Sequence, residues 1–134
     1  MINVTDEYFN WLIAHIQNEY KVNITINDSN CDKNIAAFAC NDIFLGVFDD
    51  IHNKTLALFH ELGHILSNRC LCKRGTYFSK LSQEGLAWEI GLELMNEYGF
   101  LVNYDSEPAK WARLQYQSYF NSEYNELRIS SHEN

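Results

Sequence analysis

Proline and glycine are scarce in this chain, which has one proline and six glycines among 134 residues. Disordered and low-complexity segments are usually rich in these residues, whereas this sequence is 46% hydrophobic and 14% aromatic. It contains no internal repeat. We therefore expect one folded domain over residues 1–134, which is long enough to enclose a single hydrophobic core.

Basic residues are also few, with 10 Lys and Arg against 18 Asp and Glu and a formal net charge of −8. This balance repels the phosphates of nucleic acids and the anionic surface of a membrane. No apolar run approaches the roughly 18 residues of a membrane span, and the first residues lack the pattern of a signal peptide. We expect a cytoplasmic protein that binds neither nucleic acid nor membranes, with its four cysteines reduced.

The spacing of hydrophobic residues predicts an α+β fold, with a small antiparallel or mixed sheet of about three strands packed on helices. Apolar and polar residues alternate over residues 22–26, as in a strand. The apolar runs 35–40 and 43–48 flank Asn41-Asp42, a pair suited to a tight hairpin turn. Four helices are predicted, at about 6–20 after an N-cap at Thr5, at 52–67, from Ser79 or Ser82 to Gly99, and at about 108–124, with a loop at 68–77.

The predicted central helix contains the sequence His60-Glu61-Leu62-Gly63-His64. Residues four apart lie one turn apart on the same face of a helix, so both imidazoles can reach one metal ion. Glu61 lies about 100° round the axis, where it can reach a water beside the metal instead of joining the ligands. Two unpaired histidines would be costly to bury in a helix this apolar, which favours a metal site. We predict His60 and His64 as ligands and Glu61 as general base.

Catalytic zinc sites use three protein ligands and keep a fourth position open, so one ligand must come from elsewhere in the chain. We predict Glu84, which lies 20 residues after His64 in the first turns of the following helix. A connection of this length lets the second helix fold back antiparallel to the first. Glu89 and Glu93 are the alternatives, although Glu89 lies about 140° round the helix from Glu84, so both cannot face the metal.

The HELGH motif followed by a glutamate on the next helix resembles the gluzincin arrangement of thermolysin. Together with the preceding hairpin and the segment EGLAWEIGLELM, it is similar to the ImmA/IrrE family of small metallopeptidases, over roughly residues 35–95. The resemblance implies one zinc ion per chain and cleavage of a peptide bond in a protein substrate, such as a repressor or another regulatory protein. Because we expect a single domain with no separate sensor or DNA-binding domain, recognition of that target would fall to this domain or to a partner protein.

Zinc chemistry of this kind needs further groups around the metal. A donor opposite Glu61 would stabilise the developing oxyanion, and a peptide could pair with residues 43–48 if they form the sheet edge beside the cleft. Trp88 and Trp111 are interpreted as core residues, and Cys70 and Cys72 as ordinary thiols in the loop. Besides backbone amides, the candidate oxyanion donors are Tyr77, Tyr104, Tyr116 and His52.

A different class of function is compatible with the same ligands. The chain could be a metal-binding interaction module that docks to a regulator without cleaving it. Glu61 argues against this alternative, because a purely structural metal site does not need a carboxylate between its two histidine ligands. We therefore expect a zinc metallopeptidase.

Overall fold

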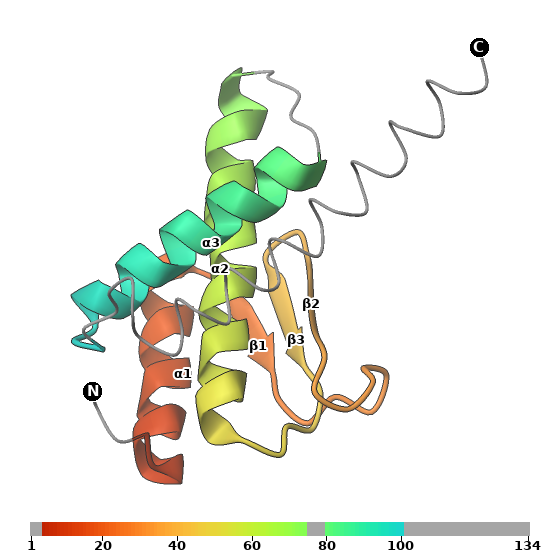
Figure 1. The fold of residues 1–134 in the computed structure, drawn as a ribbon, viewed down its shortest axis with the longest axis vertical. Coiled ribbons are helices and arrows are strands. Elements are labelled where there is room, and N and C mark those ends of the chain that lie inside the picture. Colours follow the sequence, from red (N-terminus) through yellow and green to blue (C-terminus); the bar gives the residue numbers. More distant parts are fainter. Residues whose placement is uncertain (1–3, 75–79, 101–134) are drawn as a thin grey trace, which may run out of the picture.

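The computed structural model describes residues 4–74 and 80–100 (Figure 1). They form an α+β arrangement with three helices and one sheet, in agreement with the predicted fold class. The helix predicted at 108–124 lies outside the described residues. The elements are α1 (Asp6–Tyr20), β1 (Asn23–Thr25), β2 (Ala36–Ala39), β3 (Asp42–Leu45), α2 (Ile51–Arg74) and α3 (Lys80–Glu97).

The three strands form a mixed sheet in the order β1-β3-β2. β1 pairs with β3 in parallel, with Ile24 opposite Ile43, and β2 pairs with β3 in antiparallel fashion. The predicted hairpin is therefore present, but its turn lies one residue earlier than expected. Asp42 already pairs with Ala39, and the positive φ of 54° falls on Cys40. The two-residue turn is therefore Cys40-Asn41.

Helix α1 follows the prediction closely. The Thr5 hydroxyl accepts a hydrogen bond from the Tyr8 backbone amide at 3.1 Å, which satisfies one of the unpaired donors of the first turn. The helix ends where Lys21 adopts a left-handed conformation with φ 56°. One face of α1, formed by Phe9 and two aliphatic residues spaced at helical intervals, is buried in the core.

Helix α2 is longer than predicted, because it continues to Arg74. The expectation of a loop from residue 68 is therefore wrong for residues 68–74. These residues contain no glycine or proline, and Gly75 is the first strong helix breaker after the motif. Arg69 also connects this extension of α2 to the rest of the structure, because its guanidinium donates to the Tyr20 carbonyl at 2.7 Å and to Asn41 Oδ1 at 2.9 Å.

Helix α3 begins at Lys80, so Ser82 lies inside it and is not its N-cap. Its C-terminus matches the prediction, since Gly99 has φ 89° and its amide bonds the Asn96 carbonyl at 3.0 Å. The Phe100 amide bonds the Met95 carbonyl at 3.0 Å, which completes a Schellman ending.

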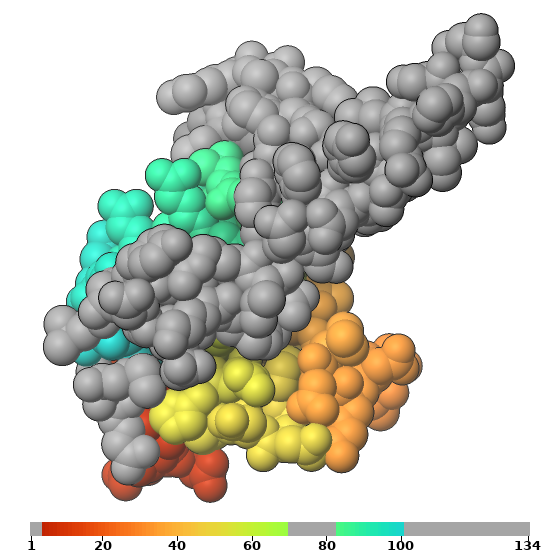
Figure 2. Space-filling model, viewed as in Figure 1, coloured from red at the N-terminus to blue at the C-terminus, as the bar shows by residue number. Residues whose placement is uncertain are grey.

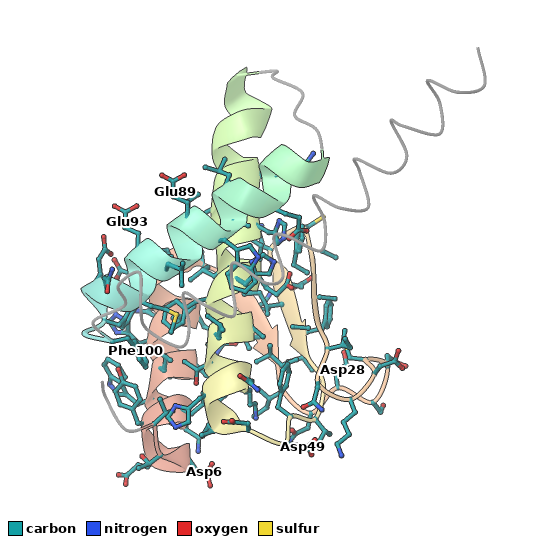
Figure 3. The ribbon with its side chains drawn as sticks, viewed as in Figure 1. Asp6, Asp28, Asp49, Glu89, Glu93 and Phe100 are labelled. Atoms are coloured by element: carbon teal, nitrogen blue, oxygen red, sulfur yellow. The ribbon has the colours of Figure 1, made fainter. Side chains whose placement is uncertain are left out.

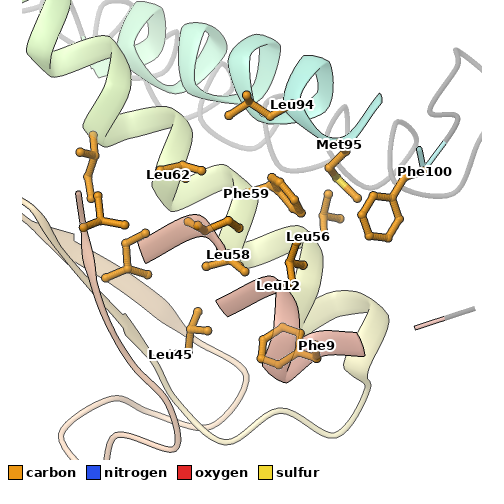
Figure 4. Close-up of a cluster of buried hydrophobic side chains, with 14 of the residues drawn as sticks. Phe9, Leu12, Leu45, Leu56, Leu58, Phe59, Leu62, Leu94, Met95 and Phe100 are labelled. Atoms are coloured by element: carbon orange, nitrogen blue, oxygen red, sulfur yellow. The ribbon is translucent and has the colours of Figure 1, made fainter. Parts of the chain in front are cut away.

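The hydrophobic core lies where α2 meets α1, the sheet and the C-terminal half of α3 (Figure 4). Leu58, Phe59 and Leu62 of α2 are fully buried, with Leu12 from α1 and Leu45 from β3. Burying each such side chain stabilises the fold by about 1.5–3 kcal/mol. The HELGH segment is therefore held within the best-packed helix of the described structure.

Helices α2 and α3 approach each other closely at two glycines. A Cβ on Gly63 would lie 2.2 Å from the Ala87 carbonyl oxygen, and one on Gly91 would lie 2.8 Å from the Phe59 carbonyl oxygen. Real Cβ atoms do not approach backbone atoms to these distances. The absence of side chains at Gly63 and Gly91 therefore sets the spacing between the two helices.

The surface of the described part places the sheet beside the start of α2. In the space-filling view, the orange segment that leads into the hairpin adjoins the yellow surface of the first turns of α2 (Figure 2). Within residues 4–74 and 80–100, no helix combines the length and apolar character needed to cross a membrane.

Candidate metal centre

His60 and His64 lie one turn apart on α2, as their spacing predicts. Their Nε2 atoms are 3.2 Å apart, and both rings point to the same position in space. His64 is buried and His60 is nearly so. Two imidazole nitrogens facing each other at this distance leave room for only one hydrogen between them, so the pair is better suited to sharing a cation.

Glu84 of α3 completes this group. Its Oε2 lies 3.0 Å from His60 Nε2, and its Oε1 lies 3.1 Å from His64 Nε2. The rival glutamates are exposed on the outside of α3, and Figure 3 shows both pointing away from α2. The structure therefore brings Glu84, and neither Glu89 nor Glu93, to the two histidines.

The three side chains have the geometry of a metal site. Each offers one ligand atom, and these atoms all lie within 4.8 Å of one another. A tetrahedral centre with nitrogen and oxygen ligands at about 2.0–2.2 Å separates its ligand atoms by roughly 3.3–3.6 Å. The two Nε2 atoms, 3.2 Å apart, are slightly closer than this, and each faces a different oxygen of Glu84, at 3.0 and 3.1 Å, so a shared ion needs only a small adjustment of the side chains. His60, His64 and Glu84 could therefore hold a metal ion.

The electrostatics of this group favour ligands in their metal-binding protonation states. Burial lowers the pKa of His60, although Glu84 opposes this shift, and a neutral imidazole is the form that binds metals. Burial raises the pKa of Glu84, but its contacts with the imidazoles of His60 and His64 outweigh burial and lower the pKa to about 2. Glu84 is therefore ionised at neutral pH.

Two aromatic side chains hold the imidazoles in place. The Trp88 ring stacks on His60 with centroids 3.8 Å apart, and the Phe38 ring stacks on His64 at 4.7 Å. Trp88 is buried, as predicted for a core residue, but it also belongs to the site. Its position four residues after Glu84 places it on the ligand face of α3, a signal that was present in the sequence. Phe38 lies on β2, and no local sequence pattern indicated that its ring would stack on His64.

Glu61 differs from Glu84 in its environment. It is only 8% exposed. Burial raises its pKa to about 7; the nearby His64 opposes this rise and the charge of Glu84 reinforces it. Glu61 thus sits beside the ligand group with a carboxyl that can both take up and release a proton near neutral pH, as a general base must.

A cavity of about 470 Å³ opens in front of these residues. The three ligand candidates and Glu61 line its polar part, while Ile35, Phe48 and Ala57 are among its apolar lining residues. This size and this mixture of a few polar groups with apolar walls are typical of ligand-binding sites. A substrate in the cavity would meet the ligand group directly.

The strand beside the cavity is β2, which corrects the prediction for residues 43–48. β3 lies in the middle of the sheet and has both its edges paired. Ala36, Ala37 and Phe38 of β2 line the cavity instead. The sequence pattern could not reveal this order, because it depends on the parallel pairing of β1 with β3 across about twenty residues of chain.

The structure places one of the four candidate oxyanion side chains. His52 is exposed in the first turn of α2 and is not among the residues that line the cavity. Tyr77, Tyr104 and Tyr116 lie outside the described residues, as does Trp111. The side chains of Cys70 and Cys72 are also outside them, although the backbone there is helical and does not form the predicted loop.

Comparison of the chain with protein-family models, with curated proteins and with solved structures finds no match.

Proposed function

We propose that this protein is a zinc-dependent metallopeptidase that hydrolyses a peptide bond in a protein substrate. The observation that carries the proposal is the convergence of His60, His64 and Glu84 within 4.8 Å, with Glu61 buried next to them in one cavity. Two histidines and a glutamate are the ligand set of one class of catalytic zinc site. We further propose that the site has the gluzincin arrangement and that the protein is similar to ImmA/IrrE metallopeptidases.

Each residue has a separate task in the proposed reaction. His60, His64 and Glu84 would hold the ion, which would supply a positive charge to polarise the scissile carbonyl and acidify water. Glu61 takes the proton from the attacking water and delivers it to the leaving amine. Burial raises the pKa of Glu61 above that of an ordinary glutamate, which makes its carboxylate a stronger base for the first transfer. Trp88 and Phe38 restrict the rotation of the ligand rings.

The substrate would lie along β2. This strand contributes residues to the cavity wall, and no strand of the described residues pairs with its outer edge, so an extended peptide could pair there. Because such pairing uses only backbone groups, it would place a peptide bond in front of the ligand group for substrates of many different sequences. A regulatory or repressor protein with an extended segment is the kind of substrate that we propose.

Metal content tests the proposal first. Protein purified without a metal-chelating tag should contain one zinc per chain by mass spectrometry, and His60→Ala and Glu84→Ala should each lose it. Glu89→Ala, a change to an exposed glutamate on the same helix, is the matched control and should retain the metal. A chain that carries no metal and takes up no added zinc would contradict the proposal.

Hydrolysis is tested separately with Glu61→Gln. This variant should bind zinc like the unmodified chain and should lose cleavage of a peptide library, followed by mass spectrometry of the fragments. If the unmodified protein binds zinc but cleaves no peptide or candidate regulator, the non-hydrolytic docking function becomes the better account of the site.

A further inference from the structure

A row of stacked aromatic rings lies on α1, away from the metal centre. Trp11 is 51% exposed although it is the largest side chain of this helix. Its ring stacks against Tyr8, with centroids 5.6 Å apart, and against His15, with centroids 5.0 Å apart. His15 in turn meets the ring of Tyr98 edge-on at 5.5 Å. The row therefore continues from α1 to the residue that follows α3.

These rings line a cavity of about 670 Å³ to which both α1 and the C-terminal end of α3 contribute residues. The two helices are labelled in Figure 1. The same cavity is lined by Glu19 of α1 and Glu97 of α3, and by Tyr20. None of the described residues that line it is Lys or Arg. Its walls thus present aromatic faces and carboxylates without an internal cation to balance them.

Helix ends make this cavity more negative. Both α1 and α3 end at it, and the carbonyls of a helix C-terminus carry partial negative charge. Neither helix has a basic residue in its last turn, where Lys or Arg is normally favourable; each has a glutamate there instead. At α1 the guanidinium of Arg69 compensates part of this charge, because it donates to the carbonyls of Tyr20 and Lys21, so the end of α3 makes the larger contribution.

The tyrosines respond to this negative environment. Burial and the charges of Glu97 and Glu19 raise the pKa of Tyr20 above its ordinary value. The pKa of Tyr98 is raised by burial first, then by the neighbouring Tyr20 hydroxyl, and to a smaller degree by the same two carboxylates. Both hydroxyls are therefore neutral donors at physiological pH, and the carboxylates are the only anionic side chains among the described residues of the wall.

We propose that this aromatic and acidic cavity binds the side chain of an arginine or lysine of a partner protein. Aromatic rings attract an organic cation, and the rings of this row hold one another in a fixed arrangement along the cavity. Glu19 and Glu97, from two different helices, line the same cavity, so both carboxylates can attract the cation. The exposed aromatic surface and the unbalanced negative charge are both explained by such a ligand.

The cavity is separate from the metal centre. Tyr98 follows Glu84 by 14 residues, which corresponds to about 21 Å along a helix. The proposal therefore does not depend on metal binding or hydrolysis. If the chain is a peptidase, a basic residue held here would be distant from the scissile bond and would select the substrate protein as a whole.

The probe for this site is a capped pentapeptide with arginine between two pairs of glycines, compared with the same peptide containing citrulline. Citrulline has nearly the shape of arginine but no charge. Binding is followed by NMR on the full ¹⁵N-labelled chain through the indole N–H of Trp11, which Trp11→Phe identifies. The arginine peptide should shift this signal saturably and leave the indole signal of Trp88 unchanged.

Variants distinguish a specific site from general charge attraction. Glu97→Gln and Trp11→Ala should each weaken the arginine peptide by about fivefold, the size expected for one exposed cation interaction. Glu89→Gln removes the same charge from an exposed position of α3 outside the cavity and should leave the affinity unchanged. Equal binding of the citrulline peptide, equal effects of Glu97→Gln and Glu89→Gln, or an unmoved Trp11 signal would each overturn the proposal.

Discussion

The closest contact between the two ligand-bearing helices can be tested by adding one methyl group. In Gly63→Ala, the new Cβ would lie 2.2 Å from the Ala87 carbonyl oxygen, 3.0 Å from its carbon and 3.2 Å from its Cα. All three atoms belong to the backbone of α3, so no side chain can rotate away. Ordinary contact begins near 3.4 Å, so α3 must move away from α2 by about 1.2 Å.

This movement would reach the metal ligands directly. Ala87 follows Glu84 by three residues and moves with it as one helical turn. Distances of 3.0 and 3.1 Å from Glu84 to the histidines would then exceed 4 Å, which is beyond the roughly 3.3–3.6 Å between the ligand atoms of a tetrahedral centre. We expect the zinc affinity to fall at least about tenfold. Overpacking costs about 1–3 kcal/mol, and alanine returns about 0.5–1 kcal/mol of helix propensity, so unfolding should become easier by about 1–2 kcal/mol.

Two glycine variants control for these effects. Gly99→Ala places alanine at φ 89° beyond the end of α3 and should cost about 1–2 kcal/mol without moving Glu84. Gly91→Ala needs a smaller separation of α2 and α3, because the nearest contact of its new Cβ is 2.8 Å. Its zinc affinity should lie between those of Gly63→Ala and Gly99→Ala. Zinc affinity is measured by competition with a chromophoric chelator, and stability by urea unfolding. If Gly63→Ala bound zinc as tightly as Gly99→Ala, the glycine contact would not control the metal site.

Further predictions concern the carboxylate of Glu61, the N-cap Thr5 and the hydrogen bonds of Arg69. The raised pKa of Glu61 means that the folded chain binds its proton more tightly, so the associated stability is complete below pH 4.5 and is lost as pH rises through about 7. With metal removed by a chelator, Glu61→Gln should therefore be more stable to urea than the unmodified chain by up to about 3 kcal/mol above pH 7. The difference should vanish below pH 4.5. An equal difference above pH 7 and below pH 4.5 would contradict this. Thr5→Ala should cost about 1 kcal/mol in thermal unfolding because α1 loses its cap, and Thr5→Ser should restore it. Arg69→Met should cost about 1–3 kcal/mol, since the Tyr20 carbonyl and Asn41 lose a charged donor. Lys33→Met removes an ion pair that water already screens and should leave the stability nearly unchanged.

Local signals in the sequence predicted much of the site. The four-residue spacing of His60 and His64 fixes their common face whatever surrounds the helix, and the structure places them as expected. Glu84 was predicted as the third ligand from its position in the first turns of the second helix. In the structure Glu84 is buried, as a ligand facing the histidines must be. A periodic pattern on one helix is therefore enough to group candidate ligands when that helix packs on its neighbour in the sequence.

Non-local pairing was beyond such reasoning. β1 joins the sheet in parallel beside β3, and this makes β2 the edge strand at the cavity instead of residues 43–48. The alternation of residues 22–26 indicates a strand but carries no information about its partner. In the same way, the role of Phe38 against His64 depends on where β2 is placed by the rest of the sheet.

Two glutamates of similar ordinary acidity occupy the same cavity with opposite electrostatic surroundings. Glu84 faces two imidazoles, which lower its pKa to about 2 in spite of its burial, whereas burial raises the pKa of Glu61 to about 7. A ligand must stay ionised and a general base must exchange protons near neutral pH, so the proposed roles need this separation. A site that only held a metal would gain nothing from a second buried carboxyl and would lose stability through it. The presence of Glu61 beside the ligand group therefore supports hydrolysis over metal binding alone.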